Sequence, residues 1–190
     1  MTAMAGALLC LAVAGCSPVV TQSAGEFAAS GPETHEVMTE TVSVAALHVE
    51  VPADWTDVSA TRGSEVYPVA YALDSSSTTS SLRFSPDYHD ATTVSEAVDQ
   101  VTDGDEPGPT VSGYVNGGSA TAQPYPGVAS ARTAEQSYET ESGVPMFVHY
   151  WFLEDASTGT IYAVEFRGED IAENAALVET IDASIALGDA

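Results

Sequence analysis

Apolar and polar residues alternate with a period of two over much of the chain from residue 40 onward, which is typical of β-strands. The first such segment, TVSVAALHVEV, changes the phase of its alternation at Ala45-Ala46. A β-bulge or a break into two short strands explains this change. The next segment, VYPVAYAL, contains Pro68, which predicts an edge strand or the start of a strand. A further short strand is expected at 81–85.

Two segments show a helical period instead. In TTVSEAVDQVTDG, Thr93 and Glu96 have the spacing of a capping box, and Gly104 is placed to end the helix. Its apolar residues share one helical face: Val94, Ala97, Val98 and Val101. The second predicted helix begins at a capping box of Asp170 and Glu173 and ends at Gly188. Its predicted apolar face consists of Ile171, Ala175, Val178, Ile181 and Ile185.

The region between the helices predicts a strand at 111–114 that enters a tight turn at 116–118, followed by a meander of three strands. These three strands are expected at 128–138, 144–153 and 160–167. Residues 146–153 are nearly all apolar, which favours a central strand covered on both faces. The order of strands and helices therefore predicts an α+β domain over residues 39–190, with an antiparallel sheet flanked by helices.

The segment before this domain has a different character. Residues 1–15 carry no charged side chain and form an apolar run too short to span a bilayer, which predicts an export signal peptide. Because residues 1–3 include no Lys or Arg, we expect the recorded start to lie inside a longer signal. Residues 16–38 are rich in Ser, Ala, Gly, Thr and Glu and predict a flexible tether that begins at Cys16.

The tetrapeptide Val13-Ala14-Gly15-Cys16 resembles the lipobox of bacterial lipoproteins. The resemblance implies that Cys16 receives a diacylglyceryl group and becomes the new N-terminus after cleavage. Its acyl chains then hold the protein on the extracytoplasmic face of the cell membrane. Cys10 would leave with the signal, so the mature chain would form no disulfide. The alternative is a buried N-terminal helix with an ordinary cysteine.

Two short stretches of the domain also resemble a known family. Residues 49–55 (VEVPADW) are similar to the opening of PsbP-like domains, and residues 181–185 (IDASI) are similar to their last helix. The resemblance implies a PsbP-like α/β/α sandwich. Together with the lipobox, it is similar to the LpqN-type lipoproteins of actinobacteria. It implies a place in the cell envelope and no shared catalytic residues.

The charge of the chain is lopsided, with 28 acidic residues, four arginines and no lysine, for a net charge of -24. Such a chain repels phosphate backbones, so no nucleic-acid partner is expected. Solubility or adaptation to a salty medium explains the excess, and an acidic site for a cationic ligand is the alternative.

No motif marks a catalytic, metal or cofactor site. The chain lacks G-x-S-x-G, and none of its four histidines has another three or four residues away. The cluster at 87–90 (DYHD) predicts a solvated turn rather than a cation site, and the carboxylates at 99–106 lack the spacing of a calcium loop. His149 and Trp151 share a strand face, which favours core positions with a hydrogen-bonded imidazole over a pocket wall.

We therefore expect a non-catalytic binding or accessory domain, anchored to the membrane through Cys16, that binds an envelope protein or a small ligand. Two alternatives remain open. One is a lipid or glycolipid carrier with an apolar cavity, and the other is a hydrolase whose site no motif marks.

Overall fold

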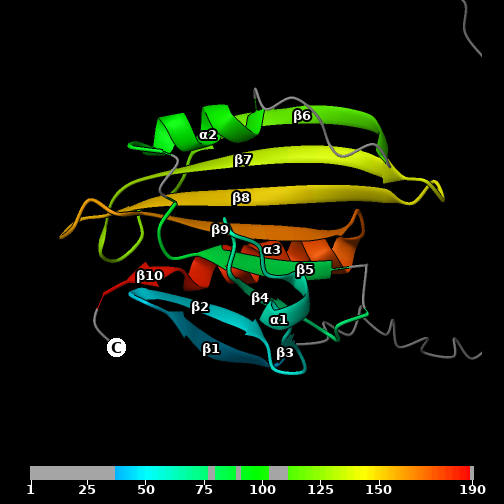
Figure 1. Ribbon diagram of the computed structural model, residues 1–190, viewed down its shortest axis with the longest axis horizontal. Helices are drawn as coiled ribbons and strands as arrows, with labels where there is room; N and C mark the ends of the chain where they lie inside the picture. The colour runs from blue at the N-terminus through cyan, green and yellow to red at the C-terminus, as the bar shows by residue number, and fades with distance from the viewer. Residues whose placement is uncertain (1–36, 77–79, 89–90, 103–110, 189–190) are drawn as a thin grey trace, which may run out of the picture. The chain divides into compact units, whose positions relative to one another are not determined.

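The computed structural model describes residues 37–76, 80–88, 91–102 and 111–188. A seven-stranded antiparallel sheet, in the order β3-β4-β5-β9-β8-β7-β6, packs with a three-stranded sheet in the order β1-β2-β10 (Figure 1). The strands are β1 (Thr39–Val44), β2 (Leu47–Pro52), β3 (Thr56–Asp57), β4 (Val69–Ala72), β5 (Ser80–Ser85), β6 (Val111–Thr121), β7 (Val128–Thr140), β8 (Pro145–Asp155), β9 (Ile161–Glu169) and β10 (Ala186–Leu187). The helices are α1 (Ser59–Arg62), α2 (Val94–Thr102) and α3 (Ala172–Ser184). The predicted α+β class with an antiparallel sheet flanked by helices is confirmed.

Strand alternation divides the core into two layers, one on each face of the large sheet. On one face, Trp151, Phe166 and Ile181 pack with the small sheet and α3, which lies behind β9 and β5 in Figure 1. On the opposite face, Tyr150 and Phe152 pack against α2. The layers are therefore those of a sandwich, and residues next to each other in one strand belong to opposite faces.

The centre of the large sheet is β9 rather than the strand at 146–153, so that prediction is wrong in position. Residues 161–166 of β9 are all buried. In β8, Phe147 and His149 are only half-buried, because α3 crosses the sheet over β9 and leaves part of β8 uncovered. A strand next to the central one can therefore be as apolar as the central strand, so composition alone does not distinguish the two positions.

The phase change at Ala45-Ala46 is a hairpin turn between β1 and β2, the second of the two predicted explanations. Ala45 adopts a positive φ of 53° there. Pro68 precedes the first residue of β4, as a strand start predicts, but β4 lies inside the sheet because the two-residue strand β3 forms the edge.

Helix α2 forms with the predicted buried residues Val94, Ala97 and Val98. One of the two hydrogen bonds of the predicted capping box forms: the amide of Glu96 donates to Thr93 Oγ1 at 3.1 Å. The Glu96 carboxylate accepts from the backbone amide and the hydroxyl of Thr92, both at 2.8 Å, instead of from Thr93. These bonds lower the pKa of Glu96.

The predicted turn at 116–118 is wrong, because β6 continues through it to Thr121. The register to β7 shifts between Asn116 and Gly118, which makes this segment a bulge. Gly118 has a φ of 91°, and its amide donates to Asn116 Oδ1 at 2.9 Å. The glycine and asparagine thus supply turn-like geometry inside a strand rather than at its end.

Helix α3 differs from its prediction in extent and in orientation. It begins after Ile171 without a side-chain cap and ends at Ser184, and residues 186–187 then pair with β2 as β10. Its buried residues are Asn174, Leu177 and Ile181, so the helix is rotated from the predicted apolar face. Ala175 is thereby exposed, and Val178 is half-buried at the edge of the core.

Candidate functional site: a groove beside the last helix

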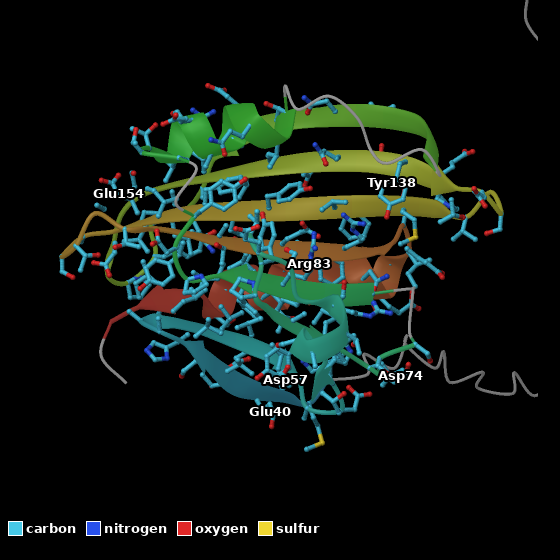
Figure 2. All side chains as sticks on the ribbon, in the orientation of Figure 1. Glu40, Asp57, Asp74, Arg83, Tyr138 and Glu154 are labelled. Carbon is cyan, nitrogen blue, oxygen red and sulfur yellow. The ribbon has the colours of Figure 1, made fainter. Side chains whose placement is uncertain are left out.

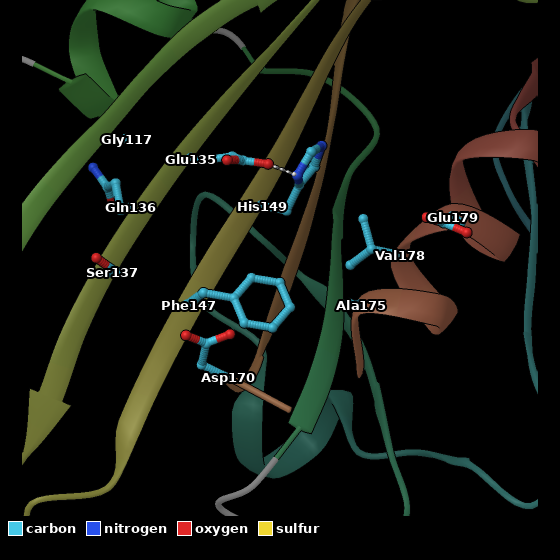
Figure 3. A pocket seen from close by; sticks show the side chains of 10 residues that line it. All are labelled: Gly117, Glu135, Gln136, Ser137, Phe147, His149, Asp170, Ala175, Val178 and Glu179. Atoms are coloured by element: carbon cyan, nitrogen blue, oxygen red, sulfur yellow. Dashed lines mark hydrogen bonds and ion pairs between the residues drawn. The ribbon is translucent and has the colours of Figure 1, made fainter. Parts of the chain in front are cut away.

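A cavity of about 460 Å³ lies between α3 and the neighbouring face of strands β6, β7 and β8 (Figure 3). We call it the α3 groove. Its lining comprises Gly117, Glu135, Gln136, Ser137, Phe147, His149, Asp170, Ala175, Val178 and Glu179.

The groove follows from strand alternation and from the rotation of α3. Glu135 and Ser137 pair with His149 and Phe147 across β7 and β8, so all four belong to the same face of the sheet. No helix covers this face beyond α3 in the part of the chain that the structure describes. Val178 packs against the edge of the core and, together with Phe147, forms an apolar strip along the groove.

Gly168 of β9 allows the start of α3 to approach the sheet beside this strip. A Cβ atom at Gly168 would come within 2.8 Å of both Asn174 Nδ2 and Phe166 Cε1. The Asn174 amide in turn donates to the carbonyl of Glu169 at 2.9 Å and fixes the first turn of the helix. The first turn of α3 is therefore a fixed wall of the groove. A side chain at residue 168 would push this turn away from the sheet.

The polar lining of the groove is acidic. Glu135, Asp170 and Glu179 contribute carboxylates and are exposed, and the lining includes no Lys or Arg. A cleft lined by charges of one sign concentrates counter-ions of the other sign. The groove therefore favours a ligand that is cationic as well as partly apolar.

His149 lines the groove with 13% of its side chain exposed, and its Nδ1 lies 3.0 Å from Glu135 Oε1. Burial lowers the pKa of His149 below its usual value, and Glu135 only partly opposes this. The imidazole is therefore neutral at pH 7. Because the carboxylate only accepts hydrogen bonds, Nδ1 carries the proton and Nε2 is the acceptor nitrogen.

A hydrogen-bonded network anchors α3 beneath this histidine. Asp182 accepts a bond from the Trp151 indole at 2.7 Å, from Gln123 at 2.6 Å and from the Tyr125 hydroxyl. Burial and the contact with Asp182 raise the pKa of Tyr125, so the phenol stays protonated and donates. A second hollow of about 350 Å³ shares His149 with the groove and extends it past Asp182.

These side chains form a binding surface rather than a recognisable catalytic constellation. Ser137, the groove hydroxyl nearest in sequence to Glu135, makes no hydrogen bond to His149 among the described residues. Over the same residues, no group of three or more His, Cys, Asp or Glu side chains has the arrangement of a metal site. No helix of the described segments is both long and apolar enough to cross a membrane.

The residues singled out in the sequence have different outcomes. Cys16, with the signal and tether at 1–36, lies outside the described residues. His89, Asp90 and the carboxylates at 103–106 also lie outside them, and Asp87 is exposed next to the buried Tyr88.

The prediction for the pair on β8 is half right. Trp151 is a core residue, as predicted, and packs 4.3 Å from the His149 ring between centroids. His149 itself is a wall of the groove, which was the alternative interpretation. Both side chains are hydrogen-bonded, so the polar atoms of the pair are satisfied.

Sequence reasoning assigned no other lining residue to a groove, and Glu135, Ser137, Ala175 and Val178 show why. The alternation at 133–137 indicates which side chains share a face, but not that the face stays uncovered. Val178 was assigned to the core because its spacing fits the helical face of Ile181. In the structure, Asn174 and Leu177 take the buried positions and Val178 lies at the edge of the core.

No known protein family matches the sequence, and no curated protein matches it either. Solved structures do match its fold. The Saccharomyces cerevisiae Ran-binding protein Mog1p matches with a TM-score of 0.50 and 12% identity, over 80% of this chain and 97% of Mog1p. PsbP (CyanoP) from Synechocystis sp. PCC 6803 matches with a TM-score of 0.52 and 10% identity, over 84% of this chain and 98% of that one.

LpqN, described as involved in cell envelope biogenesis of Mycobacterium tuberculosis, matches with a TM-score of 0.47 and 14% identity, over 80% of this chain and 91% of LpqN. At these identities the likeness concerns the fold. The chain therefore has the sandwich fold that Mog1p and PsbP share, and the PsbP-like architecture predicted from residues 49–55 and 181–185 is confirmed.

Proposed function

We propose that this protein is a lipid-anchored binding protein of a bacterial cell envelope whose α3 groove holds a segment of a partner protein. The observation that supports this most directly is the groove itself, with an apolar strip of Phe147 and Val178 between exposed carboxylates. Mog1p, which shares the fold, is described as a Ran-binding protein, so this architecture is compatible with a binding role.

The chemistry of the groove identifies the kind of segment. Glu135, Asp170 and Glu179 surround the apolar strip, and the chain as a whole carries a net charge of -24. Charge complementarity favours a segment in which Lys or Arg side chains flank one or two apolar side chains. The cationic groups would lie against the carboxylates while the apolar ones contact Phe147 and Val178.

A carrier for acyl chains is less compatible with this lining. Such a carrier needs a mostly apolar cavity that encloses its ligand. In the groove, Phe147 and Val178 alternate with exposed carboxylates, and Glu135 and Glu179 lie on opposite walls. An acyl chain in the groove would leave these carboxylates beside hydrocarbon.

A photo-cross-linking amino acid placed at Ala175 tests the groove in living cells. Both Ala175 and Ala53 are exposed alanines, but Ala53 lies in the turn after β2, away from the groove. We expect Ala175 to give a discrete cross-linked protein and Ala53 to give none. The double variant Glu135→Gln/Glu179→Gln should reduce the yield, because it removes two of the three groove carboxylates. Equal products at both positions, or none at Ala175, would contradict the proposal.

A synthetic peptide of alternating Lys and Leu provides a defined probe in solution. We expect it to bind, a Glu/Leu peptide not to bind, and the double variant to weaken binding by about tenfold at low salt. Binding that is unchanged in the variant would show that another surface is responsible.

The anchor is tested separately with Cys16→Ser. This variant should leave the membrane fraction, and intact-mass spectrometry of the wild-type protein should show an acylated chain that begins at Cys16. A variant that still sediments with membranes would contradict the anchor without affecting the groove.

A further inference from the structure

Three of the four arginines in the chain line a single cavity of about 380 Å³. Arg62 comes from α1, Arg83 from β5 and Arg167 from β9. The cavity lies on the face of the large sheet opposite to the α3 groove, and Figure 2 shows Arg83 and Tyr138 on this face. The remaining lining consists of Ser81, Tyr138, Thr140 and Met146.

The positive charge of this arginine pocket is only partly neutralised. Glu165, 2% exposed, accepts both arms of the Arg83 guanidinium, at 3.0 Å from Nε and 2.5 Å from Nη2. The same carboxylate lies 3.5 Å from Arg167 Nε. Within the described residues, the hydrogen bonds of Arg62 are two long ones of 3.4 Å, to the backbone carbonyl of Ser75. Arg83 and Arg167 therefore share the Glu165 carboxylate, and Arg62 adds a third positive charge to the pocket.

One donor at the pocket lies near a carboxylate but makes no hydrogen bond to it. Nε of Arg167 is buried and donates no hydrogen bond among the described residues, and 43% of the Arg167 side chain is exposed. Buried polar groups are nearly always hydrogen-bonded in folded proteins, so an unpaired one needs an explanation.

Aromatic rings hold two of the guanidinium groups in place. Cζ of Arg83 lies 4.8 Å from the centroid of the Tyr67 ring, and Cζ of Arg167 lies 5.9 Å from that of Tyr138. A guanidinium fixed in this way presents its donors in a defined plane, which suits the two oxygens of an oxyanion.

From this arrangement we propose that the arginine pocket binds a phosphate group, either as a soluble phosphomonoester or as the headgroup of an anionic phospholipid. Arginine forks match phosphate oxygens in geometry and in charge, and Ser81 and Thr140 add polar side chains to the lining. The pocket is larger than a lone phosphate needs, which leaves room for the group attached to it. In a chain that repels anions at long range, such a site requires local positive charge.

The small number of arginines makes a direct experiment possible. The full chain carrying Cys16→Ser has four Nε–H groups, and Arg132, which bonds to Ser119 and Ser95, does not line the pocket. Titration with inorganic phosphate, followed by NMR of the Nε–H signals, should shift Arg62, Arg83 and Arg167 in a saturable manner. Arg132 should stay in place as an internal control.

Variants test the role of the fork. Arg167→Gln should raise the Kd for phosphate by about tenfold or more, Arg167→Lys should only partly restore binding, and Arg132→Gln should leave it unchanged. If Arg167→Gln fails to fold, Arg62→Gln gives the same test at an arginine whose hydrogen bonds within the described residues go to a backbone carbonyl.

Vesicles distinguish the two sources of phosphate. Phosphatidylglycerol vesicles that shift the three signals, where phosphatidylcholine vesicles do not, would identify a headgroup, and shifts with phosphate alone would identify a soluble ligand. Equal small shifts of all four signals, or no shift in any titration, would overturn the proposal. Neither result depends on the α3 groove, which lies on the other face.

Discussion

The two faces of the large sheet carry opposite local charge although they share the same strands. On β7, Glu135 points to the α3 groove, and its neighbour Gln136 belongs to the opposite layer. On β9, Phe166 packs in the core beneath α3, while Glu165 and Arg167 lie at the arginine pocket. Neighbouring residues of one strand thus face different sites, one acidic and the other basic. The net charge of -24 is a sum over the whole chain and does not indicate the local charge of either site.

The faces also differ in how their polar groups are held. On the arginine face, a carboxylate is buried between guanidinium groups, so charge is part of the packing. On the groove face, the carboxylates of Glu135, Asp170 and Glu179 are exposed, and among the described carboxylates of that face Asp182 has the most hydrogen bonds to the fold. Removal of a charge should therefore destabilise the arginine face more than the groove face.

The largest expected effect is that of Glu165→Gln. This change leaves Arg83 without its carboxylate partner, and we expect the free energy of unfolding to fall by about 3 kcal/mol, since breaking a buried ion pair is costly. Urea denaturation measures the loss, and Glu139→Gln, at an exposed glutamate of the same sheet, is the control. The variant should also bind phosphate more tightly, because Arg83 and Arg167 then lack the carboxylate that they share. A loss as small as that of the control would contradict the claim that charge is part of the packing on the arginine face.

A smaller effect is expected of Asp182→Ala on the groove face. The substitution leaves the donors of Trp151, Gln123 and Tyr125 without their acceptor and should cost about 2 kcal/mol. Hydrogen exchange should show faster opening of α3, while phosphate binding on the other face stays unchanged. Glu173→Gln, at an exposed residue of the same helix, serves as the matched control. Unaltered exchange in α3 would mean that apolar packing alone holds the helix.

The smallest effect is a dependence of stability on pH. Burial lowers the pKa of His149 in the folded protein, so between the folded and unfolded pKa values the unfolded chain binds more protons. Stability is therefore complete above the usual histidine pKa of about 6.5 and decreases as the pH falls below it. Glu135, Asp182 and Glu179 surround the ring and limit the loss. Comparison of wild type with His149→Gln by denaturation between pH 7 and pH 5 should isolate this slope. An equal slope in both proteins would assign it to other groups.

The sequence predicted most of the elements and missed how some are placed. Period-two alternation identified the strands of the meander, and the spacing of Val94, Ala97 and Val98 identified α2, because both patterns reflect local backbone geometry. Gly118 has the positive φ expected of a turn, but the predicted end of the strand there is wrong. A positive φ suits a β-bulge as well as a turn.

The rotation of α3 shows why the groove itself escaped prediction. The apolar residues Ala175 and Val178 fit the helical face of Ile181 as well as Leu177 does, and helical spacing does not choose between them. The choice depends on Asn174, which reaches the carbonyl of Glu169 only when that side of the helix faces the sheet.

By itself the sequence determined the antiparallel α+β architecture, the surplus of acidic charge and the prediction of an acylated Cys16, since each follows from residues close together or from simple counts. Only the tertiary structure decided that Arg62, Arg83 and Arg167 meet in one pocket and that part of one sheet face stays open beside α3. The physical reason is that local periodicity specifies which side of an element is apolar. The pairing of distant strands and the packing of helices on them specify which side chains become neighbours.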